Sequence, residues 1–228
     1  MCFSPEASFG LGALLLPAGV HCVRTAAKRN RAWLPLAVTP LLFGVQQVCE
    51  GLVWVGLRTD NPGLVRPASL VFLFFALAAW PFWMPISAGC IESRPGARRL
   101  WFAMAFLGLG WFVLLYLPIL LDPARYLATR VVHHSIAYDY TEVPVVRAVP
   151  PELFRGIYAV IGGLPLIACS DGRVRLFGVL LGGAAVVSRL AFVHAFASVW
   201  CFFAAALTLY LCWIVGTLKE PGERPDPL

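Results

Sequence analysis

The chain places two amides and a carboxylate inside an apolar segment, Leu42-Phe43-Gly44-Val45-Gln46-Gln47-Val48-Cys49-Glu50-Gly51-Leu52-Val53-Trp54. On a helix, Gln46 and Gln47 lie four and three residues before Glu50, so the three polar groups share one face. An ionised carboxylate in bilayer hydrocarbon costs about 2.5 to 3.5 kcal/mol, so Glu50 must face the protein interior, find partners or keep its proton. We therefore expect an interior polar site on this helix. The alternative is a structural cluster in which the glutamines cross-link helices.

The composition predicts an all-α polytopic membrane protein. Hydrophobic residues make up 60% of the 228 residues and charged residues only 13%, and the mean hydropathy is +0.78, values that exclude an ordinary soluble domain. The net charge of +6 does not indicate nucleic-acid binding, because the basic residues lie between the apolar runs. The seven cysteines form no C-x-x-C pair and are expected to be small core residues.

The apolar runs predict a seven-helix transmembrane bundle as a single domain, residues 1–218. The expected spans are 7–23, 33–57, 68–91, 100–121, 156–170, 176–188 and 191–215. The long connection 122–155 is expected to be an extracytoplasmic loop, and 219–228 a cytoplasmic tail. With the N-terminus outside, 11 of the 18 basic residues fall on the cytoplasmic side, so we expect an N-out, C-in protein in the cell membrane.

This topology brings several polar residues to the outer end of the bundle. Glu50 lies about two turns below the outer boundary of its span, and the seventh span starts at a similar depth. The long loop closes the same end and is expected to act as a lid. The residues expected to converge on an outward-leaning cavity are Glu50, Gln46, Gln47, His194, Ser198, Arg189, His133, His134 and Tyr138.

The motifs of several other chemistries are missing from the sequence. It contains no G-x-S-x-G elbow, no P-loop and no G-x-G-x-x-G after a strand. It also lacks H-E-x-x-H and His-x-x-x-His spacings, so we predict no metal and no cofactor. A metal site that uses Glu50, His194 and one of His133 and His134 stays open as an alternative.

The chain resembles a group of small actinobacterial multispan proteins of unassigned function. These proteins open Met-Cys-Phe-Ser, as this chain does. The other matching segments are Phe43-Gly44-Val45-Gln46-Gln47 with Glu50-Gly51, His133-His134 with Tyr138, and His194-Ala195-Phe196-Ala197-Ser198-Val199-Trp200-Cys201. The resemblance covers essentially the whole chain and implies no particular reaction.

The architecture also resembles the membrane-bound terpene cyclases of meroterpenoid and indole-sesquiterpenoid pathways. That resemblance implies a lipophilic, prenylated substrate whose alkene or epoxide is protonated by an acid in the bundle. Glu50 fits this acid. The fungal members place a second acid in the sixth or seventh span, where this chain has none. Asp139, Glu142 or a protonated histidine of the loop would have to replace it.

The lead hypothesis is therefore an acid-initiated isomerase. Glu50 would donate the proton, because an apolar interior favours the neutral form of a carboxyl group, and Gln46 or Gln47 would orient it. His194, His133, His134 and Tyr138 are the other catalytic candidates. Aromatic faces and Ser198 would contact the substrate and its migrating cation. The candidates for this role, each of which could instead serve packing, are Trp54, Trp80, Trp83, Trp111, Tyr116 and Trp200.

Two other classes of function remain. In a proton-coupled transporter, Glu50 and His194 would form a relay, although no inverted repeat is visible in the sequence. In a metal-dependent intramembrane hydrolase or oxidoreductase, the histidines would be ligands. The expected partners are the lipid bilayer and a lipophilic prenylated molecule, with no nucleic acid, and the sequence leaves the oligomeric state open.

Overall fold

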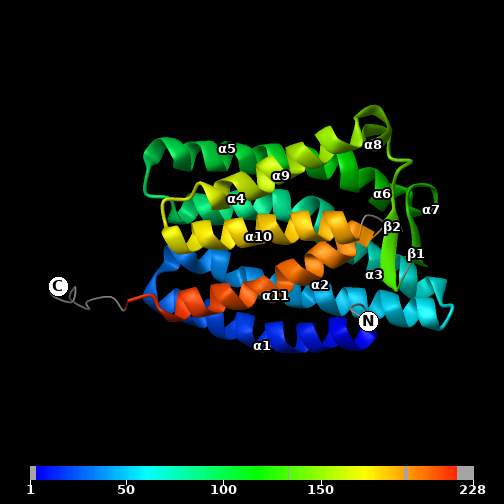
Figure 1. Ribbon diagram of the computed structural model, residues 1–228, viewed down its shortest axis with the longest axis horizontal. Helices are drawn as coiled ribbons and strands as arrows, with labels where there is room; N and C mark the ends of the chain where they lie inside the picture. Colours follow the sequence, from blue (N-terminus) through cyan, green and yellow to red (C-terminus); the bar gives the residue numbers. More distant parts are fainter. Residues whose placement is uncertain (1–3, 133, 193–194, 220–228) are drawn as a thin grey trace.

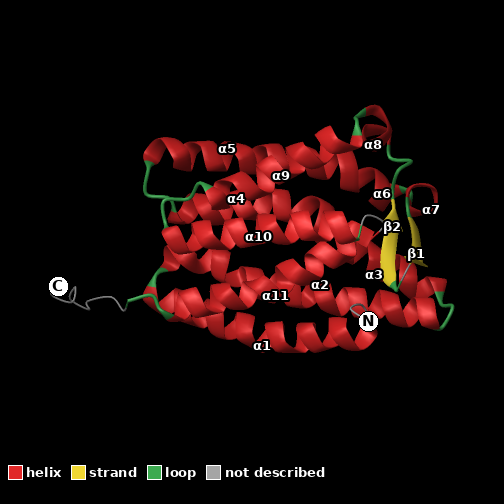
Figure 2. Cartoon of the chain, in the orientation of Figure 1, coloured by secondary structure: helices red, strands yellow, loops and turns green. Residues whose placement is uncertain are grey.

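The computed structural model describes residues 4–132, 134–192 and 195–219 of the chain. These residues form a bundle of long, nearly antiparallel helices with a small β-hairpin at one end (Figure 1). Figure 2 shows how little of the chain is not helical. The prediction of an all-α polytopic membrane fold is confirmed.

The first half of the chain forms four long helical rods. Helix α1 is capped by Ser4, whose hydroxyl accepts a hydrogen bond from the backbone nitrogen of Ala7 at 3.3 Å. A short 3₁₀ turn precedes α2, and π-helical turns join α3 to α4 and α5 to α6 without ending the rods. The bounds are α1 Pro5–Arg29, 3₁₀ Arg31–Trp33, α2 Leu34–Arg58, α3 Pro62–Leu73, π Phe74–Ala79, α4 Trp80–Ile91, α5 Pro95–Trp111, π Phe112–Tyr116 and α6 Leu117–Leu121.

The second half begins with small elements and ends with three long helices. Asp171 caps α10 by accepting hydrogen bonds from the backbone nitrogens of Arg173 and Val174. The bounds are α7 Pro123–Tyr126, β1 Ala128–Val132, β2 Ser135–Asp139, α8 Pro144–Ala148, α9 Pro151–Ile167, α10 Gly172–Ala191 and α11 Phe196–Gly216.

The number of spans differs from the predicted seven. Six helical segments of the described residues are long and apolar enough to cross a membrane: Pro5–Arg29, Arg31–Arg58, Pro62–Ile91, Pro95–Leu121, Gly172–Ala191 and Phe196–Gly216. The predicted fifth span, 156–170, falls on α9, which has 17 residues. Such a helix is about 25 Å long, shorter than hydrocarbon of about 30 Å. Nevertheless α9 runs between the same two ends of the bundle as its neighbours (Figure 1).

The division of the last apolar run also lies later than expected. We expected a break near Ser188 and Arg189, but α10 continues to Ala191. Arg189 lies in the last turn of this helix, and its guanidinium reaches Glu152 of α9 at 3.2 Å. The loop between α10 and α11 therefore lies three residues beyond the predicted position.

Close helix contacts depend on glycine at several positions, of which Gly19 and Gly108 are two. A Cβ on Gly19 of α1 would lie 2.6 Å from the backbone nitrogen of Leu41 in α2, and a Cβ on Gly108 of α5 would lie 2.5 Å from the carbonyl oxygen of Pro81. Backbone atoms cannot move aside cheaply, so both helix pairs require glycine there. A Cβ on Gly110, one half-turn away, would meet nothing within 4 Å.

The segment predicted as a long loop contains the hairpin. Strands β1 and β2 are antiparallel, with Ala128 opposite Asp139 and Val132 opposite Ser135. The hairpin packs on the bundle: Ile136 is fully buried, and the Thr129 hydroxyl donates a hydrogen bond to the Ser69 hydroxyl of α3 at 3.1 Å. The hairpin therefore covers the end of the bundle where α2 ends and α11 begins (Figure 1).

Candidate functional site

Glu50 is buried inside the bundle, with 1% of its surface exposed. Its Oε1 accepts a hydrogen bond from the Ser198 hydroxyl of α11 at 2.5 Å. Its Oε2 accepts a hydrogen bond from the side-chain nitrogen of Gln47 at 3.4 Å. Gln47 and Ser198 are fully buried. The structure thus brings three of the predicted site residues into one contact.

The charge on this site has no counterion among the described residues. None of the ion pairs that they form includes Glu50. Arg189, which we considered for this end of the bundle, is instead paired with Glu152 on the surface. Both hydrogen-bond partners of Glu50 are uncharged.

Gln46 is turned toward a different neighbour. Its Oε1 accepts a hydrogen bond from the indole nitrogen of Trp80 in α4 at 3.1 Å. The Trp80 ring stacks on Phe43, with ring centroids 4.0 Å apart. Gln46 therefore cross-links α2 and α4, which is the structural role that the sequence left open for the glutamines.

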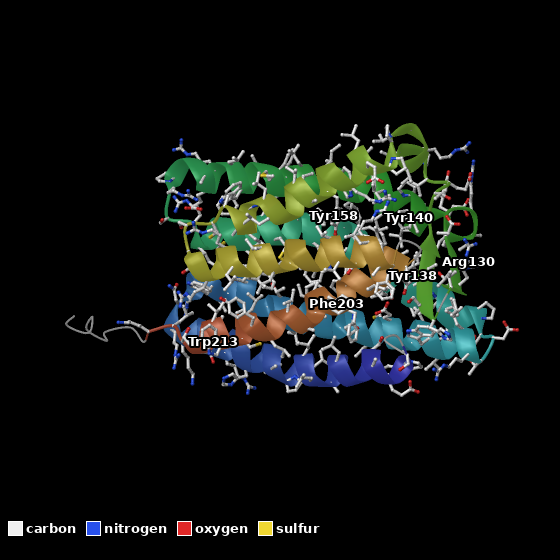
Figure 3. All side chains as sticks on the ribbon, in the orientation of Figure 1. Arg130, Tyr138, Tyr140, Tyr158, Phe203 and Trp213 are labelled. Atoms are coloured by element: carbon white, nitrogen blue, oxygen red, sulfur yellow. The ribbon has the colours of Figure 1, made fainter. Side chains whose placement is uncertain are left out.

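Tyr138 reaches the site from the hairpin. Its ring stacks on Phe72 of α3, with centroids 4.8 Å apart, and its hydroxyl is buried without a hydrogen-bond partner among the described residues. Its pKa is raised well above the usual value, first by burial and then by the nearby negative charge of Glu50. Tyr138 is therefore an O–H donor close to Glu50. Figure 3 shows it at the hairpin end of the bundle.

The predicted aromatic residues lie at different distances from Glu50. Trp54 is buried one turn beyond Glu50 on the same helix, and Trp80 contacts Gln46. Trp83 lies far away, because it donates to the carbonyl of Pro35, fifteen residues and about 22 Å before Glu50 along the helix.

The remaining three aromatic candidates pack around Tyr158 and the α3 rod. The ring of Trp200 meets that of Tyr158 edge to face at 5.9 Å, and Trp111 meets Tyr158 at 6.4 Å. Tyr116 donates a hydrogen bond to the carbonyl of Leu70 at 3.0 Å. Packing contacts hold these three rings, but the indole nitrogens of Trp111 and Trp200 are buried without a hydrogen-bond partner among the described residues.

Of the three histidine candidates, only His134 belongs to the described residues. His133 and His194 lie outside the described residues. His134 is exposed next to the hairpin turn with a φ of 62°. Within the described parts of the chain, no group of three His, Cys, Asp or Glu side chains could hold a metal ion.

The loop acids lie on the outer side of the hairpin. Asp139 faces Arg130 at 3.6 Å, and its pKa is lowered mainly by hydrogen bonds from Thr141. Glu142 pairs with Arg147 at 3.2 Å. Asp139 and Glu142 line a small surface cavity of about 200 Å³, together with Ala124, Arg125, Tyr126, Leu127, Ala128 and Thr141. This cavity is separate from the Glu50 site.

Sequence reasoning missed a second buried carboxylate, Glu92, at the opposite end of the bundle. Its side chain is fully buried and accepts hydrogen bonds from the backbone and guanidinium nitrogens of Arg94, the Trp101 indole and the Ser170 backbone nitrogen. Arg94, above all, holds its pKa well below the usual range. The local signal was an acid directly after an apolar run with arginine two residues later.

The sequence from residue 1 to residue 225 matches the model of a family of unknown function, DUF6629. The chain belongs to this family. No curated protein and no solved structure matches it. Because the function of the DUF6629 family is unknown, membership does not indicate a reaction, and the function is inferred from the buried residues.

Proposed function

We propose that this DUF6629 protein is a membrane-embedded enzyme of the terpene cyclase type, in which Glu50 protonates a lipophilic polyprenyl substrate. The observation that carries the proposal is the chemistry of the two Glu50 partners. A serine hydroxyl and a glutamine amide can each donate or accept a hydrogen bond. Ser198 and Gln47 therefore suit both protonation states of Glu50.

This property is what a proton donor needs. The carboxylate accepts hydrogen bonds from Ser198 and Gln47 in the observed arrangement. After proton uptake, the carboxyl O–H can donate to the Ser198 oxygen, or to the Gln47 carbonyl once the amide rotates. A lysine or arginine partner offers only donors and would hold the carboxylate ionised.

Glu92 provides the contrast within the same chain. All the groups that bind it are donors, and one of them is a guanidinium. Such an environment keeps a carboxylate permanently charged and serves structure. Two buried carboxyl groups with such different partners support a catalytic role for the one with neutral partners.

The surroundings of Glu50 also suit a carbocation reaction. Trp54 offers a π-face on the same side of α2, and Trp80 lies one turn below. The hairpin packs over this end of the bundle and excludes water, which would otherwise quench a cation. Turnover of a polyprenyl substrate by membranes that contain the protein, and its loss on Glu50→Gln, test the proposal.

The hairpin must lift for a substrate to reach Glu50, and a cross-link should prevent this. The Ser69 and Thr129 hydroxyl oxygens are 3.1 Å apart, so Ser69→Cys combined with Thr129→Cys places two thiols within bonding reach. We expect oxidation of the double variant to lower turnover by about tenfold or more, because gating becomes rate-limiting. Product formation before and after dithiothreitol is the measurement.

The single variant Ser69→Cys, treated with the same oxidant, is the control and should keep its turnover. Cross-linking is verified by cleavage in the α4–α5 connection, which lies between the two cysteines in the sequence, because only the cross-linked fragments then migrate together on a non-reducing gel. If the cross-linked protein works at full speed, the hairpin is a fixed cover and not a lid.

We further propose that the hairpin end faces outward. Nine of the 18 basic residues lie in, or within six residues of, the α1–α2, α4–α5 and α9–α10 connections at the opposite end, and two more follow α11 in the sequence. Such residues favour the cytoplasm. A reporter fused after Leu228 should therefore be active in the cytoplasm, and one inserted beside Thr141 should be active outside. The reverse pattern would overturn this orientation.

A proton-coupled carrier is the second candidate, because neutral partners of Glu50 also suit a proton relay. The unpaired Tyr138 hydroxyl, close to Glu50 on the hairpin, favours it. Vesicles distinguish the two functions. A carrier shows Glu50-dependent proton flux without a change in its cargo, whereas a cyclase makes a product and moves no net proton.

A further inference from the structure

Several buried polar atoms lack a hydrogen-bond partner among the described residues. The side-chain nitrogen of Gln46 is one of them, on the Trp80 side of α2, and three others lie near Glu50. They are the carbonyl oxygen of the Gln47 amide, the indole nitrogen of Trp54 and the hydroxyl of Tyr138. Buried polar groups in native proteins nearly always have a partner, so each unpaired one requires an explanation. Because three of them lie near one carboxyl group, they suit a site that is completed by a group outside the described residues.

The three atoms belong to one neighbourhood. The Gln47 oxygen is on the same amide whose nitrogen donates to Glu50. Trp54 lies four residues after Glu50 on α2, hence on the same face. Tyr138 packs against the apolar cluster that contains Trp54, and the Glu50 charge acts on its hydroxyl.

The set contains one acceptor and two donors. The Gln47 carbonyl needs a donor, while the Trp54 N–H and the Tyr138 O–H need acceptors. A hydrocarbon satisfies none of them. A ketone or ether oxygen accepts but cannot donate, and an ammonium group donates but cannot accept. A hydroxyl group does both.

We propose that Gln47, Trp54 and Tyr138 bind the hydroxyl group of a lipophilic alcohol or phenol beside Glu50. The inference deepens the proposed function and rests on it for the reaction, but the binding does not depend on proton transfer. Anchoring the hydroxyl orients the attached chain relative to the acid. Because a water molecule presents the same O–H chemistry, the test must separate it from an alcohol.

The experiment compares two probes of the same carbon skeleton, farnesol and the hydrocarbon farnesene, with the full-length protein in lipid nanodiscs. Binding is followed by tryptophan fluorescence, with probe concentration expressed per lipid so that partitioning cancels. We expect the wild-type protein to bind farnesol about tenfold more tightly than farnesene. Tyr138→Phe keeps the ring stacked on Phe72 and should remove about fivefold of that preference, leaving farnesene unchanged.

Tyr210→Phe is the matched control, because the Tyr210 hydroxyl reaches the Arg173 carbonyl at the opposite end of the bundle. It should leave both affinities unchanged. Trp54→Phe removes the indole N–H and provides a second variant should Tyr138→Phe be poorly folded. It should reduce the farnesol preference by a similar factor.

Equal binding of farnesol and farnesene to the wild-type protein would overturn the proposal. So would a preference that survives both Tyr138→Phe and Trp54→Phe. If neither probe binds and Tyr138→Phe merely lowers the melting temperature, the site holds water only, and the proposal is wrong. If the preference depends on Tyr138 while Glu50→Gln protein still turns over substrate normally, the subsite stands and the proposed function fails.

Discussion

Membranes that carry the Glu50→Gln protein should turn over the polyprenyl substrate about two to four orders of magnitude more slowly than wild-type membranes. Glutamine has nearly the size of glutamate and can still bond to Ser198 and Gln47, but it has no transferable proton. The protein should therefore insert, fold and bind substrate yet fail to react. The measurement is product formation by mass spectrometry, normalised to the amount of folded protein.

Glu152→Gln is the matched control, because Glu152 is an exposed acid that pairs with Arg155 and Arg189 on the surface. Its turnover should match wild type. If Glu50 only links helices, Glu50→Gln should lower the melting temperature more than the rate. Near-normal turnover by the Glu50→Gln protein contradicts the proposal, and Asp139 and Glu142 would then be the acids to replace.

Glu92→Gln should lower the free energy of unfolding by about 3 kcal/mol, because hydrogen bonds to a charged group contribute about 1.5 to 3 kcal/mol each. The carboxylate joins the α4–α5 turn to Ser170 in the α9–α10 turn. In the variant, the side-chain N–H groups of the glutamine face N–H donors of Arg94, Trp101 or Ser170, and two donors cannot form a hydrogen bond with each other. Unfolding in mixed micelles, followed by tryptophan fluorescence, measures the loss.

The same residue gives stability a pH dependence of known sign. The folded-state pKa of Glu92 is depressed, so its contribution is complete above the unfolded-state pKa of about 4.3 and is lost as the pH falls below that value. Wild-type protein should therefore lose more stability between about pH 5 and pH 2 than the Glu92→Gln variant does. Parallel losses would show that Glu92 is not the group responsible. The exposed Glu6, paired with Arg58, provides a control variant, Glu6→Gln, that should behave as wild type.

Much of the fold follows from the sequence alone. The apolar composition and the lengths of the runs determine a multi-span helical bundle, since only a helix satisfies its own backbone hydrogen bonds in lipid. The helical period also determines that Gln47, Glu50 and Trp54 share one face of α2. These are local properties, set by spacing within one segment.

The hairpin and the length of α9 could not be predicted in the same way. Strands β1 and β2 are five residues each, and β1 carries Arg130 among apolar residues, so the segment resembled an irregular loop. Their pairing is stabilised by packing on the bundle, through Ile136 and the Thr129 contact with Ser69. The residue pattern of two five-residue strands does not indicate whether they will pack on the bundle in this way.

The long-range partners of the two buried carboxyl groups were decided only by the tertiary structure. Ser198 meets Glu50 across 148 positions of sequence, and Ser170 meets Glu92 across 78. Helical spacing determines which residues share a face but not which face of another helix packs against it. That choice depends on the close approach of whole helices, for example at Gly19 and Gly108. Hence the sequence alone identified Glu50 as a buried acid beside Gln47, and local spacing placed Arg94 beside Glu92. Tertiary packing added Ser198 to the first carboxyl group and Ser170 to the second.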